Sequence, residues 1–199
     1  VYDCLRGRLD AVEGTITMSG IQQYAEQIMN ANRIVMVACG TSWHAGLVAE
    51  YIFEELCRIN VEVEYASEFR YRNPGIHKGD VIIAISQSGE TADTLVAIEN
   101  AKQKGAIILG VVNVVGSSIA RTSHGGAYTH AGPEIGVAST KAFTAQLAVL
   151  TMIALKLGYL RGTISEERYR NLLTELEQIP EKVAWTLQQS EHIKALAEK

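Results

Sequence analysis

Three short runs of apolar residues constrain the fold of this chain more than any other feature. They cover residues 33–38, 80–85 and 107–113, in which only the end residues Arg33, Asp80 and Asn113 are polar, and a stretch with helical periodicity follows each run. Because successive residues in each run are apolar, both faces of the expected strands must be buried, as in a parallel sheet. The alternation of such strands with helices predicts an α/β fold, with a parallel sheet and helices on both of its faces.

The remaining segments fit the same plan. Helices are expected over residues 17–30, 44–58 and 94–104, over a short stretch ending near 122, and over a long apolar stretch from 139 or 140 to 157. Short strands are expected over residues 61–66 and 126–130. Gly158 is the expected stop of the long helix, and Ser165 is the expected N-cap of the next one. We place the compact domain at residues 21–159.

Composition excludes several broad classes of protein. Apolar residues make up 47% and charged residues 20% of the 199 residues, which is typical of a folded domain and not of a disordered chain. The net charge of −4 argues against nucleic-acid binding. The longest apolar run, residues 145–157, is interrupted by Gln146 and Lys156, so we expect no membrane span. Three cysteines without a CxxC pair favour a reduced, cytoplasmic protein.

Two turns rich in hydroxyl groups follow the first two apolar runs. Residues 40–42 (Gly-Thr-Ser) and 86–91 (Ser-Gln-Ser-Gly-Glu-Thr) each lead into a helix N-terminus at the same edge of the sheet. Free N–H groups at such a terminus attract an anion, and hydroxyls donate to phosphate oxygens. One hydroxyl is enough to cap a helix, yet Ser86, Ser88 and Thr91 supply three. We therefore expect a small phosphate monoester here, with helix capping as the alternative.

A third segment, residues 136–141 (Gly-Val-Ala-Ser-Thr-Lys), places small residues in front of the long apolar helix. Small residues permit close approach of a ligand, and this helix N-terminus again offers N–H donors. Glu90, Glu134 and His44 lie nearby in the sequence. A carboxylate next to a phosphate is repelled, so we expect the two glutamates to orient backbone groups or the sugar.

Other motifs for phosphate and metal binding are missing. The sequence has neither GxxxxGK[ST] nor a GxGxxG after the first strand, which argues against nucleoside-triphosphate and dinucleotide sites. The sequence contains no HxH or HExxH spacing, so it does not indicate a metal site. A flavodoxin-like site for a flavin phosphate is still compatible with the pattern.

Three motifs, in this order along the chain, resemble those of the sugar isomerase (SIS) domain family. They are Cys-Gly-Thr-Ser at 39–42, Ser-Gln-Ser-Gly-Glu-Thr-Ala-Asp-Thr at 86–94, and Gly-Pro-Glu-Ile-Gly-Val-Ala-Ser-Thr-Lys at 132–141. Together with residues 6–8 and 66–72, they resemble the first of two SIS domains in the glutamine-dependent fructose-6-phosphate aminotransferases. The resemblance implies a flavodoxin-like, three-layer α/β/α fold that binds fructose 6-phosphate or glucosamine 6-phosphate.

The resemblance also implies roles for individual residues. Phosphate contacts fall on Ser42, Ser86, Gln87, Ser88 and Thr91. Sugar contacts fall on Thr41, Val137, Ala138 and Ser139. The resemblance implies no metal or cofactor, and it implies a homodimer formed through the helices of the domain. The catalytic base of this family lies in its second SIS domain, so we expect no catalytic residue within this chain and no activity from it alone.

Further expectations concern the ends of the chain and the alternative functions. Residues 1–20 are expected to be a linker from a glutaminase domain, and residues 160–199 a helical linker towards a second SIS domain. A sugar-phosphate sensor of SIS type is the main alternative, although residues 1–32 lack the basic helix-turn-helix usual in such regulators. A flavin protein is the other alternative, and its purified form would be yellow.

Overall fold

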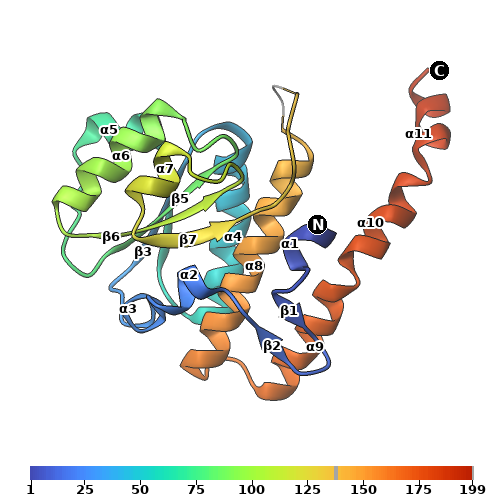
Figure 1. The fold of residues 1–199 in the computed structure, drawn as a ribbon, viewed down its shortest axis with the longest axis horizontal. Coiled ribbons are helices and arrows are strands. Elements are labelled where there is room, and N and C mark those ends of the chain that lie inside the picture. Colours follow the sequence, from blue (N-terminus) through green and yellow to red (C-terminus); the bar gives the residue numbers. More distant parts are fainter. Residues whose placement is uncertain (137–138, 199) are drawn as a thin grey trace.

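The computed structural model describes residues 1–136 and 139–198, and at its centre lies a five-stranded parallel sheet (Figure 1). The strands are β3 (Ile34–Ala38), β4 (Val61–Tyr65), β5 (Val81–Ser86), β6 (Ile107–Val112) and β7 (Gly125–Tyr128). Their spatial order is β4-β3-β5-β6-β7, and each neighbouring pair is parallel. The carboxyl ends of the strands therefore lie at one edge, and the chain changes direction across the sheet between β3 and β5.

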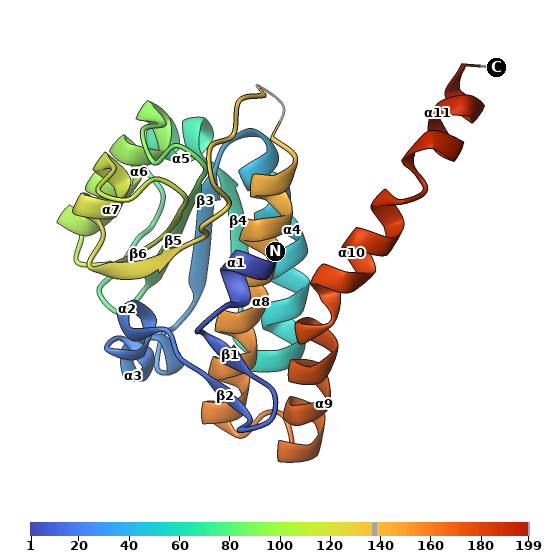
Figure 2. The ribbon, with the colours of Figure 1, turned by 45° about the vertical axis from the view of Figure 1, so that its right-hand side comes forward.

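Helices cover both faces of this sheet, which confirms the three-layer α/β/α prediction (Figures 1 and 2). One face carries α5 (Ala66–Arg72), α6 (Ala92–Gln103) and α7 (Ser118–Thr122), and the other carries α4 (Gly40–Cys57) and α8 (Lys141–Arg161). Ile34 and Met36 of β3 join the core with α4 and α8, whereas Val35 and Val37 join the core with α6. This burial on both faces explains why the strands are apolar throughout.

Helix α8 is long and apolar enough to cross a membrane by length and composition alone. In this fold it is a core helix, because 61% of its most apolar 18-residue window is buried and it packs along α4. The expected stop at Gly158 is wrong, since α8 continues to Arg161 and ends at Gly162 with a left-handed φ of 68°. Gly158 serves close packing instead: a Cβ there would lie 2.6 Å from the carbonyl oxygen of Leu56 in α4.

Three other elements differ from the prediction. The helix expected over residues 17–30 is divided into α2 (Ser19–Gln22) and α3 (Ala25–Met29), because Tyr24 leaves the helical path and donates its hydroxyl to the His124 carbonyl at 3.0 Å. Helix α4 begins at Gly40 instead of 44, so residues 41 and 42 belong to its first turn. Helix α5 was not predicted, because only Ala66 and Phe69 of this short helix are buried.

The two ends of the chain flank this sheet domain. Helix α1 (Tyr2–Leu5) contacts α8, and the hairpin of β1 (Leu9–Asp10) and β2 (Thr15–Ile16) contacts α9 (Glu166–Glu177). The Ser165 hydroxyl caps α9 as predicted, accepting from the Arg168 N–H at 3.2 Å. Helices α10 (Ile179–Leu187) and α11 (Ser190–Ala197) then extend from the body as an arm (Figure 2). The domain limits at residues 21 and 159 stay a prediction.

The contact between α4 and α8 at Gly158 predicts an unusual response to alanine. Gly→Ala in a helix normally stabilises a protein by about 1 kcal/mol. Here the added Cβ would meet backbone, so we expect Gly158→Ala to lower the free energy of unfolding by about 1–2 kcal/mol. Gly75→Ala is the control, because its Cβ would meet no atom closer than 3.8 Å. Urea denaturation that shows equal stability for both variants would contradict the packing role of Gly158.

Candidate functional site

A cavity of about 230 Å³ opens at the carboxyl ends of β3 and β5, where the chain changes direction across the sheet. In open α/β sheets, ligands bind at such a crossover point. The residues that line the cavity are Cys39, Gly40, Thr41, Ser42, Ile85, Ser86, Gln87, Ser88, Thr91, Glu134, Gly136 and Ser139. The structure thus brings together the five residues expected to contact phosphate and two of those expected to contact the sugar. The other two, Val137 and Ala138, lie outside the described residues.

The hydroxyl groups of this cavity are not helix caps. Helix α4 begins after Cys39 and helix α6 begins after Thr91, and neither helix has a side-chain hydrogen bond at its N-cap. Within the described part of the chain, the N-cap residues of α4 and α6 therefore take none of the first N–H groups of their helices, unlike Ser165 in α9. One of these groups, the Gly40 N–H of α4, donates instead to the Tyr65 hydroxyl at 3.2 Å. The capping alternative does not describe these two turns, and the positive ends of two helix dipoles are available at one cavity.

The turn at residues 86–91, which runs from the last residue of β5 to the N-cap of α6, is held by hydrogen bonds within itself. The buried Ser86 Oγ accepts from the Gly89 N–H at 3.0 Å and lies 3.3 Å from Thr91 Oγ1, while Ser88 Oγ accepts from the Glu90 N–H at 3.1 Å. Gly89 has a φ of 69°, and a Cβ there would lie 2.0 Å from Ser117 Oγ. Only glycine fits this close approach of the loop to α7.

Helix α7 fixes the same loop from outside. The Ile119 N–H donates to the Gly89 carbonyl at 2.9 Å, and the Ser118 N–H donates to Glu90 Oε1 at 2.8 Å. Hydrogen bonding by Ser118 is the largest of the causes that lower the pKa of the Glu90 carboxyl. Glu90 therefore orients a backbone group of α7, one of the two roles that its position in the sequence suggested.

The third helix N-terminus near the cavity is already occupied by a carboxylate of the protein. Glu134 Oε2 accepts from Ala142 N at 3.1 Å, from Thr140 N at 3.2 Å and from Ser139 Oγ at 3.4 Å. The hydrogen bond from Ala142 is the largest of the causes that lower the pKa of Glu134. Glu134 therefore takes the N–H of Ala142 in the first turn of α8 and that of the N-cap Thr140, so part of the donor set expected for a ligand at this terminus is used within the protein.

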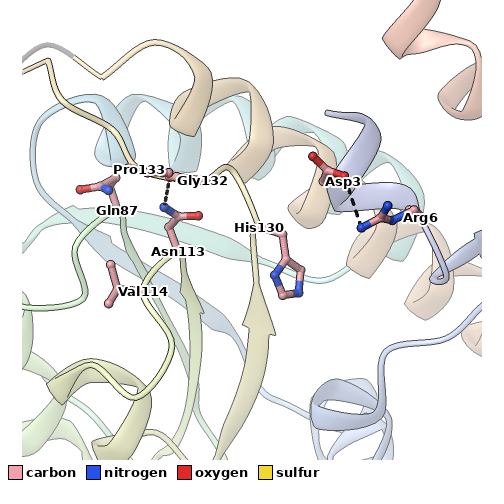
Figure 3. A pocket seen from close by; sticks show the side chains of 8 residues that line it. All are labelled: Asp3, Arg6, Gln87, Asn113, Val114, His130, Gly132 and Pro133. Carbon is pink, nitrogen blue, oxygen red and sulfur yellow. Dashed lines mark hydrogen bonds and ion pairs between the residues drawn. The ribbon is translucent and has the colours of Figure 1, made fainter.

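A second and larger cavity, of about 630 Å³, adjoins the first through Gln87, which lines both (Figure 3). Its walls are Asp3, Arg6, Gln87, Asn113, Val114, His130, Gly132 and Pro133. Asn113 organises the wall by donating from Nδ2 to the Gly132 carbonyl at 2.7 Å and by accepting from Thr129 Oγ1 at 3.0 Å. Burial is the main cause that lowers the pKa of His130. Sequence reasoning missed this cavity, because the contribution of α1 depends on a long-range contact.

Comparison with known proteins places this chain in a family. A model of the SIS domain matches residues 27–156, and the chain belongs to the SIS domain family. Two curated relatives are named glutamine–fructose-6-phosphate aminotransferase [isomerizing]. The one from Bacteroides thetaiotaomicron is 54% identical and the one from Chlorobaculum tepidum 57% identical, each over 99% of this chain. This chain spans only 32% of the length of each relative.

A solved structure agrees with these relatives. The C-terminal domain of glucosamine-fructose-6-phosphate aminotransferase from Francisella tularensis superposes with a TM-score of 0.90 at 35% identity. The match covers 99% of this chain and 55% of that one. The whole chain therefore corresponds in fold to part of the C-terminal domain of that aminotransferase.

The carboxylate at the start of α8 predicts a pH dependence of stability. Because the pKa of Glu134 is lower in the folded chain than its ordinary value, the ionised group stabilises the fold above that ordinary value. This contribution is lost as the pH falls through the lowered pKa. We expect Glu134→Gln to be less stable than the unaltered chain at about pH 6, and the difference to shrink towards about pH 3. Denaturation across this pH range measures it, with Glu13→Gln as an exposed control. A difference that does not change with pH would contradict the capping role.

Proposed function

We propose that this chain binds the phosphate of fructose 6-phosphate or glucosamine 6-phosphate in the smaller cavity, as one SIS domain of a glutamine–fructose-6-phosphate aminotransferase. The observation that carries the proposal is that two helix N-termini, whose N-cap residues form no side-chain cap in the described part of the chain, converge on one cavity lined by hydroxyl groups. Such termini bind phosphate through N–H groups and the helix dipole. The choice of fructose 6-phosphate as the ligand is taken from the names of the relatives.

The chemistry of the cavity wall fits a phosphate held without a cation. The described residues that line the cavity include no Lys or Arg, so the attraction comes from helix dipoles and from hydroxyl and amide donors. Ser42, Ser86, Gln87, Ser88 and Thr91 are assigned to the phosphate. Thr41 and Ser139 are assigned to the sugar, together with Val137 and Ala138, which lie outside the described residues. Binding by the chain alone is expected to be weak, since the cavity is open to water.

The proposal extends to the reaction named for the relatives, transfer of an amino group from glutamine to fructose 6-phosphate with isomerisation. In that reaction this chain holds the phosphate end of the sugar, and the chemistry belongs to other parts of the whole protein. The proposed assembly is a cytoplasmic homodimer. Its support is the outer face of α4, where Tyr51 is 75% and Val48 is 42% exposed in the single chain.

Replacing Ser88 tests the phosphate assignment. Ser88→Ala removes one donor to a charged group, so we expect the affinity for fructose 6-phosphate to fall at least about tenfold with little change in melting temperature. Ser165→Ala is the matched control, because Ser165 is a true helix cap. It is expected to lower stability by about 1 kcal/mol and to leave affinity unchanged. Titration of both variants by NMR chemical shifts, together with thermal denaturation, checks the pair. A Ser88→Ala variant that loses stability but keeps its affinity would show a structural hydroxyl.

The chain by itself is expected to catalyse neither isomerisation nor amination. Moving a proton between the first two carbons of the sugar needs a base within about 2.6–3.2 Å and a pKa near the working pH. The carboxylate in the cavity wall, Glu134, is a weak base, because its pKa is lowered and its oxygen accepts three hydrogen bonds. A coupled assay for glucose 6-phosphate formed from fructose 6-phosphate checks this. Turnover that disappears in Glu134→Gln would place the base in this domain after all.

A further inference from the structure

A buried glutamine, Gln146, lies next to the hydroxyl of Ser42. It belongs to the long helix that the sequence pattern predicted to be apolar. Gln146 in α8 is 1% exposed, and its Nε2 donates to Ser42 Oγ in α4 at 2.9 Å. Ser42 is itself only 6% exposed, yet it lines the smaller cavity. The side chain thus joins the core of the domain to one wall of the proposed phosphate site.

Stability alone does not account for this glutamine. Its Oε1 is buried and has no hydrogen-bond partner within the described part of the chain. Burying a polar atom without a partner costs free energy, and a methionine or leucine of similar size would avoid that cost. The neighbouring positions of α8, Ala145 and Ala148, are buried and apolar, as expected for a core helix. The hydrogen bond from its side chain to Ser42 is therefore the feature that distinguishes Gln146 from an apolar residue.

The direction of that hydrogen bond determines what the Ser42 hydroxyl offers to a ligand. A hydroxyl has one proton to donate and two lone pairs to accept with. Gln146 occupies a lone pair of Ser42 Oγ, and among residues 1–136 and 139–198 no atom accepts the Ser42 proton. The proton is left for a group in the cavity. A phosphate oxygen accepts hydrogen bonds and carries negative charge, so it needs a donor at this point.

We infer that Gln146 is a positioning residue, which holds Ser42 as a hydrogen-bond donor towards the phosphate. This inference rests on the proposed function, because it concerns the same cavity. It also gives a reason for the close packing of α4 on α8: the packing brings an amide of one helix to the first turn of the other, where Ser42 lies. An apolar residue at 146 would leave the Ser42 hydroxyl free to rotate and to donate elsewhere.

The test is a double-mutant cycle on the 199-residue chain, with fructose 6-phosphate as the ligand and affinity measured by NMR titration. Ser42→Ala is expected to weaken binding about tenfold, and Gln146→Met about fivefold. In the Ser42→Ala background, Gln146→Met is expected to have no further effect beyond about twofold, since the residue it positions is gone. Gln103→Met, on the exposed side of α6, is the matched control and is expected to leave affinity unchanged.

A second variant gives a readout that loss of packing does not produce. In Gln146→Glu, the introduced carboxylate accepts the proton of Ser42 and adds negative charge behind the site, so binding is expected to be lost at about pH 8. Burial raises the pKa of such a carboxyl, and once protonated it donates to Ser42 Oγ as the amide does. The phosphate itself titrates near pH 6. The quantity to compare is therefore the ratio of variant to unaltered affinity, which is expected to rise as the pH falls from about 8 to 6.

The possible results separate this inference from the proposed function. If the unaltered chain does not bind fructose 6-phosphate, both are overturned. If it binds and Ser42→Ala weakens binding, but Gln146→Met does not, the positioning role alone is wrong. Additive effects of Ser42→Ala and Gln146→Met, or a Gln146→Glu ratio independent of pH, overturn it as well. If Gln146→Met fails to fold, the pH dependence of Gln146→Glu and its comparison with Ser42→Ala decide the question.

Discussion

The packing of α4 against α8 is the constraint on which the rest of this structure depends. Helix α4 carries Thr41 and Ser42 into the cavity, and its direction is set by β3 on one side and by α8 on the other. Gly158 permits the approach at one end of the contact, where a side chain would meet the carbonyl of Leu56. Near the other end, Gln146 hydrogen-bonds Ser42. A shift of either helix would move the first turn of α4, and therefore the wall of the cavity.

Three helix N-termini lie near this cavity, and they differ in whether a carboxylate of the protein accepts from their N–H groups. The start of α8 is neutralised by Glu134, which accepts from two of its N–H groups. At α4 and α6 the N-cap residues form no side-chain cap within the described part of the chain. The first turn of α6 does hold a carboxylate, Asp93, but it is paired with Arg70 at 3.0 Å. The helix dipoles of α4 and α6 therefore favour an anion at the carboxyl ends of β3 and β5 more than the dipole of α8 does. In the proposed function, the phosphate binds on that side.

The sequence was sufficient to predict the sheet and the main cavity residues, for physical reasons that are specific to this fold. Strands buried on both faces must be apolar throughout, so β3, β5 and β6 stand out in the chain. Parallel strands also bring their carboxyl ends to one edge, which places the turns at 40–42 and 86–91 side by side without further information. The family motifs then assigned roles to individual residues, and those roles stay predictions.

Features that depend on contacts between distant residues were not visible in the sequence. A glycine near the end of a helical pattern suits a helix stop as well as a close contact, and only the position of Leu56 shows which applies to Gly158. Gln146 and Ser42 lie 104 residues apart, so no spacing rule joins them. The same is true of the larger cavity, which is lined by Asp3 of α1, by Arg6 directly after that helix and by His130 (Figure 3).

The described cavity wall contains no Lys or Arg, and this affects both how strongly such a site binds phosphate and how well it orients the phosphate oxygens. A phosphate held by a fixed cation is bound through strong, partly desolvated charge pairs, and removing it is slow when the pairs are buried. Hydroxyls, amides and helix dipoles bind more weakly, but they fix the direction of each phosphate oxygen, because every donor has a defined geometry. Orientation of the phosphate therefore depends on whether each hydroxyl proton points into the cavity.

In this chain the backbone of residues 86–91 orients the hydroxyls of Ser86 and Ser88, because they accept from the N–H groups of Gly89 and Glu90. Gln146 supplies the corresponding hydrogen bond for Ser42. The hydroxyls of Ser42, in the first turn of α4, and Ser88, in the loop before α6, are thus alike: each accepts from an N–H of the protein, and neither donates to another atom of the described residues. The Ser86 hydroxyl, at the end of β5, accepts from an N–H in the same way and also lies 3.3 Å from Thr91 Oγ1.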